Sequence, residues 1–269
     1  METDSGDSTM IHHLIGGTLH APPNPRAGCH CLVLQHGGKL ALVDTGIGLR
    51  DVAEPEKRIG EETIRLEGFQ FHEEETILRQ LERQGFRADD VTDIVLTHAD
   101  PDHTGGLADF PEARVHLSRE EHVSLARGRV RYAPAHFDHG PSWQLHGPSR
   151  ERWLGLEARS IALGNGVDVL LVPLFGHTLG HCGVAVREGE RWLLHVGDAY
   201  YLRVELDRDD HPVGQLAALR ADDDARRRAS LAQLRRLARD HAGEVDCCGY
   251  HDLDELARWS SPWRTTTSV

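Results

Sequence analysis

The sequence Val95-Leu96-Thr97-His98-Ala99-Asp100-Pro101-Asp102-His103-Thr104-Gly105-Gly106 carries more chemical information than any other part of the chain. Within six residues it holds four side chains of the kind that bind metals, directly after an apolar run at 93–96 that reads as a strand. In an extended segment His98 and Asp100 point to the same side, because side chains alternate along a strand. Asp102 and His103 follow on the turn and can face a second, adjacent point. Two adjacent points of this kind are what a dinuclear metal centre requires.

A simpler interpretation is that His98 and Asp102 only cap the helix that follows, as Asp often does. Capping employs one carboxylate and leaves both histidines and Asp100 without a role, so metal binding is the favoured interpretation. Three later residues strengthen it: each follows a predicted strand, at 167–172, 192–196 and 244–248, and these residues are His177, Asp198 and His251. Loops at strand ends converge in space. We therefore expect seven donors at one sheet edge.

In this order, the motifs resemble those of the metallo-β-lactamase fold superfamily of hydrolases, which has HxHxDH, a single His, a single Asp and a final His. The resemblance runs from about the first strand to His251, nearly the whole chain, and the set of motifs is far more specific than any one of them. One departure is plain: Asp100 stands where the family has its second His. The resemblance implies an α/β fold, a four-layer αββα sandwich, which we expect to form one domain over residues 1–269.

Transferred position by position, the family pattern implies two divalent metal ions. His98, Asp100 and His177 would bind one ion, Asp102, His103 and His251 the other, with Asp198 bridging them. A hydroxide held between the two ions would then be the nucleophile. Zinc is the expected metal. A carboxylate at position 100 adds negative charge and makes Fe or Mn more competitive. It also resembles the HxExDH of flavodiiron proteins, so an iron-dependent oxidoreductase on the same fold remains an alternative.

Two tyrosine-containing segments, Asp198-Ala199-Tyr200-Tyr201 and Tyr250-His251-Asp252, resemble the N-acyl homoserine lactonase branch of the superfamily. There a Tyr three residues after the bridging Asp hydrogen-bonds the lactone carbonyl, a role that would fall to Tyr201. Asp102 would pass a proton to the leaving alkoxide. We therefore expect a hydrolase of lactones or other carboxylic esters, with Asp102 and Tyr201 as catalytic residues. Phosphotriester or thioester hydrolysis is an alternative, and either tyrosine could equally be a buried aromatic.

The composition of the chain limits the kinds of partner that the protein is expected to bind. A formal net charge of -13 argues against a nucleic-acid surface, which needs a positive field. No apolar run approaches the ~18 residues of a membrane span, and the first five residues are acidic where a signal peptide would be basic. We expect a cytoplasmic protein that binds a small-molecule substrate and neither nucleic acid nor membrane. Five cysteines without a CxxC motif favour reduced core thiols. A homodimer is possible by analogy with relatives.

Other segments give expectations about local structure. Two apolar runs at 31–34 and 40–44 flank Gly37-Gly38 and predict a hairpin, after which Asp44 either supports the ligands or merely forms a turn. Residues 47–71 lack periodicity and predict a long loop or lid with short helical pieces, which could also supply a dimer interface. The aromatic-rich segment 131–153 is either a wall of the substrate pocket or a surface loop with self-packed aromatics. Residues 225–241 predict an amphipathic helix, and 260–269 a loose tail.

Two further histidines are expected to play supporting roles only. His181 follows His177 closely and should pack or hydrogen-bond behind it. His195 lies inside an apolar strand and is expected to be a satisfied core residue rather than a ligand.

Overall fold

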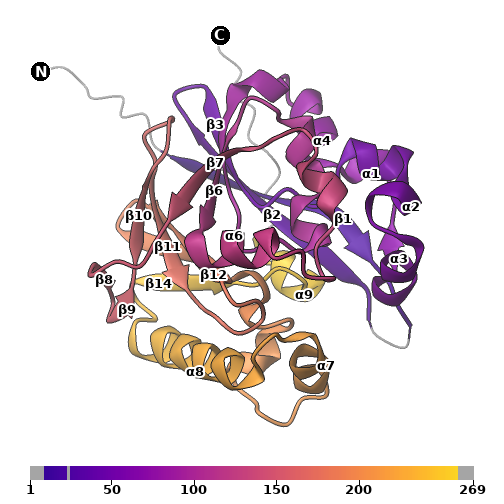
Figure 1. The fold of residues 1–269 in the computed structure, drawn as a ribbon. Helices are drawn as coiled ribbons and strands as arrows, with labels where there is room; N and C mark the ends of the chain where they lie inside the picture. Colours follow the sequence, from indigo (N-terminus) through magenta and orange to yellow (C-terminus); the bar gives the residue numbers. More distant parts are fainter. Residues whose placement is uncertain (1–8, 23–24, 260–269) are drawn as a thin grey trace, which may run out of the picture.

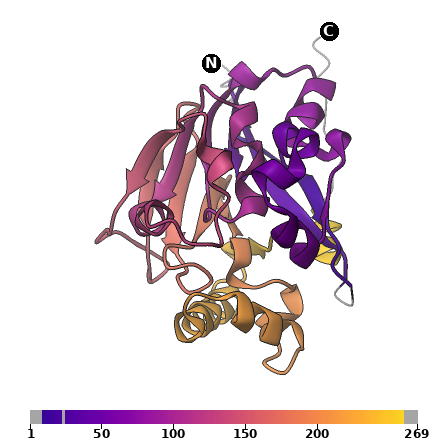
Figure 2. The same cartoon turned by 45° about the vertical axis from the view of Figure 1, so that its right-hand side comes forward.

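A computed structural model describes residues 9–22 and 25–259 as two facing β-sheets with helices on their outer sides (Figure 1). The turned view separates the two sheets and shows the long helix α8 beside the second one (Figure 2). This is the arrangement expected for the αββα sandwich. The anticipated tail at 260–269 and part of the Pro-rich loop near residue 23 lie outside the described residues.

The first sheet has the strand order β4-β1-β2-β3-β5-β6-β7. Its strands are β1 (Met10–Leu19), β2 (Ala27–His36), β3 (Lys39–Val43), β4 (Phe69–Gln70), β5 (Val91–Val95), β6 (Arg114–Ser118) and β7 (Ser142–His146). The pairs β1–β2, β1–β4 and β2–β3 are antiparallel. The pairs β3–β5, β5–β6 and β6–β7 are parallel. The β2–β3 hairpin turns at Gly37 and Gly38, both with positive φ, as the sequence predicts.

The second sheet has the order β10-β11-β12-β13-β14. Its strands are β10 (Arg159–Ala162), β11 (Asp168–Pro173), β12 (Cys182–Glu188), β13 (Arg191–His195) and β14 (Val245–Cys248), and a separate small ribbon joins β8 (Arg152–Trp153) to β9 (Leu156–Glu157). Only the β13–β14 pair is parallel. Parallel pairing places the ends of β13 and β14 at one edge, which brings the residues that follow each strand together.

Helices cover both outer faces. They are α1 (Leu49–Ala53), α2 (Pro55–Arg58), α3 (Glu61–Glu67), α4 (Ile77–Arg83), α5 (Pro101–Thr104), α6 (Arg119–Ala126), α7 (Val213–Arg220), α8 (Asp224–Asp240) and α9 (Leu253–Leu256). Short 3-10 helices are η1 (Glu73–Glu75), η2 (Ala88–Asp90), η3 (Gly105–Asp109), η4 (Pro134–Phe137), η5 (Gly197–Ala199) and η6 (Arg203–Leu206). None of the described helices combines the length and apolarity needed to cross a bilayer.

Alternation along β3 shows how the layers are built. Val43 faces the second sheet, in a buried cluster with Leu171 and Val184, whereas Leu42 faces the opposite way, in a cluster with Leu81 of α4. Successive side chains of a strand point to opposite faces, so one short strand supplies both cores. On the far side, Leu234 and other apolar residues of α8 pack on the second sheet. The five cysteines are buried and free, as predicted.

The short helical pieces expected at 47–71 are present, and together with β4 they make up more of the segment than a long loop would: α1, α2, α3 and β4 occupy most of it. The helices are too short to show an apolar period, and local signals define them instead. Pro55 begins α2, and Gly68 ends α3 in the left-handed conformation with its N–H bonded to the Ile64 carbonyl. Val52, Ile59 and Ile64 of this segment pack in the apolar cluster on the outer side of the first sheet, which holds the short helices in place.

Candidate metal centre

The first ligand segment is fixed by Asp44 at the end of β3. The Asp44 carboxylate accepts hydrogen bonds from the Thr97 N–H and hydroxyl, both at 2.8 Å, and from Nδ1 of His103 at 2.8 Å. Asp44 itself has a φ of 56°, which is uncommon for a residue with a side chain. β3 and β5 are adjacent parallel strands, so this carboxylate orients the segment that follows β5, in the supporting role considered from the sequence.

The hydrogen bonds determine which nitrogen each histidine presents to the centre. The Thr97 hydroxyl donates to Asp44, so Nδ1–H of His98 donates to Thr97 at 3.0 Å and Nε2 keeps its lone pair. His103 donates from Nδ1 to Asp44, and His251 donates from Nδ1 to the Gly28 carbonyl at 3.1 Å. Nε2 of each ring therefore points to the centre, where it is the nitrogen available to a cation.

The seven residues predicted as ligands lie together at one edge of the sandwich. Their donor atoms form overlapping groups within which all atoms lie no more than 4.8 Å apart: His98, Asp100 and His177; His98, His103 and Asp198; Asp102, His103 and His251. Asp198 lies between the outer groups, since Oδ2 is 3.4 Å from Nε2 of His177 and 3.3 Å from Nε2 of His251. This position fits the bridging role that the family pattern implies.

The donor set fits divalent cations. Among the described residues, three buried atoms at the centre of the cluster have no hydrogen-bond partner: Nε2 of His98, Nε2 of His103 and Oδ1 of Asp198. Buried polar atoms are normally satisfied, so three unpartnered donor atoms that converge on one place fit a site for a cation. Imidazole and carboxylate donors suit Zn, Fe and Mn alike.

The protonation of the cluster also responds to its carboxylates. Burial lowers the pKa of His98 well below its ordinary value, and the neighbouring His103 lowers it further. Burial acts in the same direction on His103, but the carboxylates of Asp102, Asp44 and Asp198 outweigh it and raise its pKa well above the ordinary value. A cation entering the centre would take the place of the proton on His103.

Arg131 is a neighbour of the cluster that sequence reasoning missed. Its guanidinium donates to both carboxylate oxygens of Asp100, at 2.7 and 2.6 Å, and to Nε2 of His177 at 3.0 Å. Burial opposes ionisation of Asp100, yet the charge of Arg131 helps to hold the pKa of this carboxyl well below its usual range. The carboxylate that replaces the family's second His is thus paired with a cationic side chain, which offsets the extra negative charge expected from the sequence.

Glu121 connects the two ligand segments through hydrogen bonds. This buried carboxylate accepts from the Ala99 N–H at 3.1 Å, the Gly180 N–H at 3.1 Å, the Thr178 hydroxyl at 2.6 Å and the Tyr132 hydroxyl at 3.0 Å. Ser118 caps α6, with its Oγ accepting from the Glu121 N–H at 3.0 Å. The Glu121 side chain turns inward from the first turn of this helix.

The other singled-out histidines lie where expected. Nδ1 of His181 donates to the Leu174 carbonyl at 3.0 Å, so its Nε2 can accept from the Asp198 N–H at 3.0 Å, behind the cluster. His195 is fully buried and donates from Nε2 to the His30 carbonyl at 2.8 Å.

One cavity of about 780 Å³ opens onto the cluster. Its floor includes Asp100, Asp102, His177, Asp198, Tyr201 and His251, and its walls include apolar side chains from α3 and α7: Leu66, Val213, Leu216 and Leu219. The ring of Tyr201 lies edge-on to those of His177 and His251, with centroids 5.9 and 5.3 Å away. Tyr201 therefore lies beside the predicted ligands and faces the cavity.

The expectation that aromatic residues of 131–153 form a pocket wall is wrong. Of this segment only Arg131 lines the cavity. Trp143 lies on β7, at the edge of the first sheet, and packs on Phe137 with ring centroids 5.9 Å apart. The alternative of self-packed aromatics therefore holds. The Pro and Gly residues on both sides of β7 obscured the strand in the sequence.

Comparison with known proteins agrees with this geometry. Residues 24–245 match the family model described as the metallo-beta-lactamase superfamily. The chain belongs to this superfamily. The superfamily membership and fold predicted from the motifs are thereby confirmed. Proteins named "probable metallo-hydrolase" from Mycobacterium tuberculosis and Mycobacterium bovis are each 43% identical over 209 residues, 75% of this chain. The match spans 66% of the length of these relatives, just under two thirds.

Solved structures of the superfamily share the fold at low identity. An N-acyl homoserine lactone hydrolase, with N-hexanoyl-L-homoserine bound at its catalytic metal centre, has a TM-score of 0.73 and 17% identity, and the match covers 96% of this chain and 99% of that chain. A dizinc quorum-quenching lactonase has a TM-score of 0.56 and 21% identity, over 96% of this chain and 86% of its own. At such identities the likeness shows a common fold.

Proposed function

We propose that this superfamily member is a dinuclear metal-dependent hydrolase that opens a lactone or cleaves another small carboxylic ester. The observation that carries the proposal is the seven-donor cluster on the floor of a cavity with an apolar stretch of wall from α3 and α7. Such a cavity suits a substrate with a carbonyl at one end and an aliphatic chain at the other. The names of the mycobacterial relatives and of the lactonase structures support this class of reaction.

His98, Asp100 and His177 would hold one cation and Asp102, His103 and His251 the other, with Asp198 shared. When bound, the two cations would supply an activated water and polarise the substrate carbonyl. The protein contributes a fixed set of acceptors: Asp44 and Thr97 orient two imidazoles, and His181 holds the backbone of Asp198. Preorganised donors and acceptors of this kind need no rearrangement during the reaction.

The remaining steps need a donor to the carbonyl and a proton for the leaving oxygen. Tyr201 lies at the cavity floor, and burial raises the pKa of its phenol well above the ordinary value, so it stays protonated and can donate. Asp102 lies on the same cavity floor, and its carboxylate would take up a proton there and pass it to the departing alkoxide.

The test combines metal analysis with a substrate panel. Purified protein is assayed before and after treatment with a chelator, and after zinc, iron or manganese is restored, against lactones, carboxylic esters, phosphotriesters and β-lactams. We expect about two metal ions per chain, activity on lactones or esters, loss of that activity on chelation and recovery with zinc. Full activity of the metal-free protein would rule out the mechanism. A visible iron signal with redox activity would favour the oxidoreductase alternative instead.

A further inference from the structure

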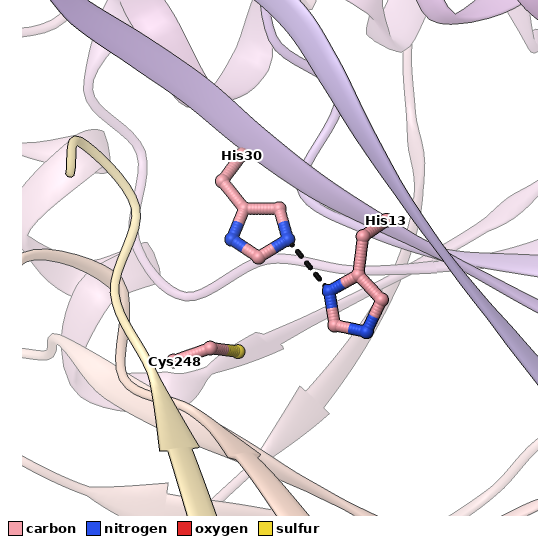
Figure 3. A group of neighbouring side chains, drawn as sticks. All are labelled: His13, His30 and Cys248. Carbon is pink, nitrogen blue, oxygen red and sulfur yellow. Dashed lines mark hydrogen bonds between the residues drawn. The ribbon is translucent and has the colours of Figure 1, made fainter. Parts of the chain in front are cut away.

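A second group of metal-type donors lies between the two sheets and has no part in the mechanism above. His13 on β1, His30 on β2 and Cys248 at the end of β14 each offer one atom, and the three atoms lie within 4.8 Å of one another (Figure 3). The two imidazoles come from the first sheet and the thiol from the second. The figure shows the sulfur directed toward the pair of rings.

Hydrogen bonding shows which atoms are available for a ligand. Nδ1 of His30 donates to the Gly249 carbonyl at 2.9 Å, because a carbonyl can only accept. Nε2 of His30 therefore carries a lone pair, and it lies 2.9 Å from Nδ1 of His13. The two rings share one proton along this line, which the dashed contact in Figure 3 marks. An ion can take the place of that proton if the rings move apart by a few tenths of an ångström.

Both imidazoles are neutral near pH 7. Burial lowers the pKa of His13 to about 3, with a contribution from the charge of His30, and burial lowers that of His30 to about 4. Cys248 and His30 are buried, whereas His13 is half-buried, so an ion can reach the site from the side of β1. Trp259 stacks on the His13 ring, with centroids 5.2 Å apart and planes 12° from parallel, and fixes its orientation.

We propose that His13, His30 and Cys248 form a separate, mononuclear site for a borderline-soft transition ion of the Zn²⁺ class. Two imidazoles and one thiolate are the donors such ions prefer, and hard cations avoid sulfur. On binding, Cys248 releases its thiol proton, and the Nδ1 proton of His13 moves to Nε2. The ion joins the two sheets just before His251, because Tyr250 and Gly249 lie between that ligand and Cys248.

Sulfur distinguishes this site from the candidate dinuclear centre, which has only nitrogen and oxygen donors. Metal-free full-length protein is titrated with Co²⁺ under reducing conditions, while cobalt per chain and thiolate-to-cobalt charge-transfer absorption in the near ultraviolet are measured. We expect about three ions per chain and a charge-transfer band. Absence of the band would overturn the proposal, whether or not the dinuclear centre fills and the protein hydrolyses esters.

The adjacent cysteine provides a matched control. Cys247 packs on the α8 side of β14 with Leu194 and Leu234, whereas Cys248 belongs to the cluster between the sheets. Cys248→Ser should abolish the band and leave about two ions per chain, and Cys247→Ser should keep the band and all three. A band that survives Cys248→Ser contradicts the assignment. If that variant fails to fold, the half-buried His13→Gln substitution serves instead and should weaken binding of the third ion at least tenfold; unchanged binding would refute the site.

Discussion

Arg131 and Asp100 form a two-pronged ion pair at the floor of the cavity, with N–O distances of 2.7 and 2.6 Å. The residue that departs from the family's metal-binding motif is therefore matched by a partner 31 positions further along the chain. An aspartate in place of a histidine adds one negative charge, and the guanidinium adds one positive charge. The pair keeps the net charge of the predicted centre close to that of a site with histidine at this position.

Removal of the Arg131 charge should tighten cation binding and slow the reaction. In Arg131→Met the carboxylate of Asp100 is unpaired, so we expect affinity for Zn²⁺ to rise about tenfold. We also expect the acidic limb of the pH–rate profile to move to higher pH, because more anionic ligands make a bound water less acidic. Arg131→Lys keeps the charge without the fork geometry and should give intermediate values. Chelator competition and pH–rate profiles measure both effects. Weaker zinc binding in the Met variant would show that Arg131 mainly positions Asp100.

The adjacent tyrosines provide a matched pair. Tyr201→Phe keeps the ring between His177 and His251 but removes the hydroxyl, and we expect kcat/KM to fall by about 100-fold with unchanged metal content, the usual effect of losing one donor to a developing oxyanion. Tyr200 instead donates to Glu255 at 3.0 Å in the core. Tyr200→Phe should cost about 1–3 kcal/mol of unfolding free energy with little effect on turnover. An unaltered rate in Tyr201→Phe would remove the tyrosine from the mechanism.

Glu121→Gln should loosen the two ligand segments. The carboxylate accepts from four donors, and an amide NH₂ placed there would face donors instead. Leaving buried donors unsatisfied costs about 1–3 kcal/mol each, so we expect unfolding free energy to fall by about 2–4 kcal/mol and zinc to dissociate faster. Denaturant titration and metal-release kinetics measure these losses. An unchanged free energy of unfolding in this variant would contradict the prediction, because the four donors would then be satisfied without the carboxylate.

Asp109 should make stability depend on pH. Burial raises its pKa to about 7, and the charge of Asp51 adds to the effect, while a hydrogen bond from the Leu49 N–H opposes it. The folded protein thus binds this proton more tightly than the unfolded chain, so the contribution of Asp109 to stability is present below about pH 4 and is lost as pH rises to about 7. We expect Asp109→Asn to stabilise the protein at pH 8 by roughly 1–2 kcal/mol and to have little effect at pH 4. Equal effects at both pH values would contradict this origin.

Sequence reasoning located the seven predicted ligands because each lies directly in a local pattern: a dense motif or the residue after an apolar strand. It could not find Arg131 or Glu121, since their partners lie far along the chain and only the folded sheet edges bring them together. Apolar periodicity could not place the short helices of 47–71, because capping and packing produce them. Metal binding and catalysis by the seven donors, Asp102 and Tyr201 stay predictions until metal content and activity are measured.

The position of Asp198 between donors from both halves of the chain also bears on how long the protein survives. An ion ligated from both sheets acts as a non-covalent cross-link, and opening either half would first have to release it. At a free zinc concentration one hundred times the dissociation constant, such ligation adds about 2.7 kcal/mol to the folded state. Zinc starvation would then leave the same polypeptide more open to proteolysis, so its abundance in a cell would follow metal supply.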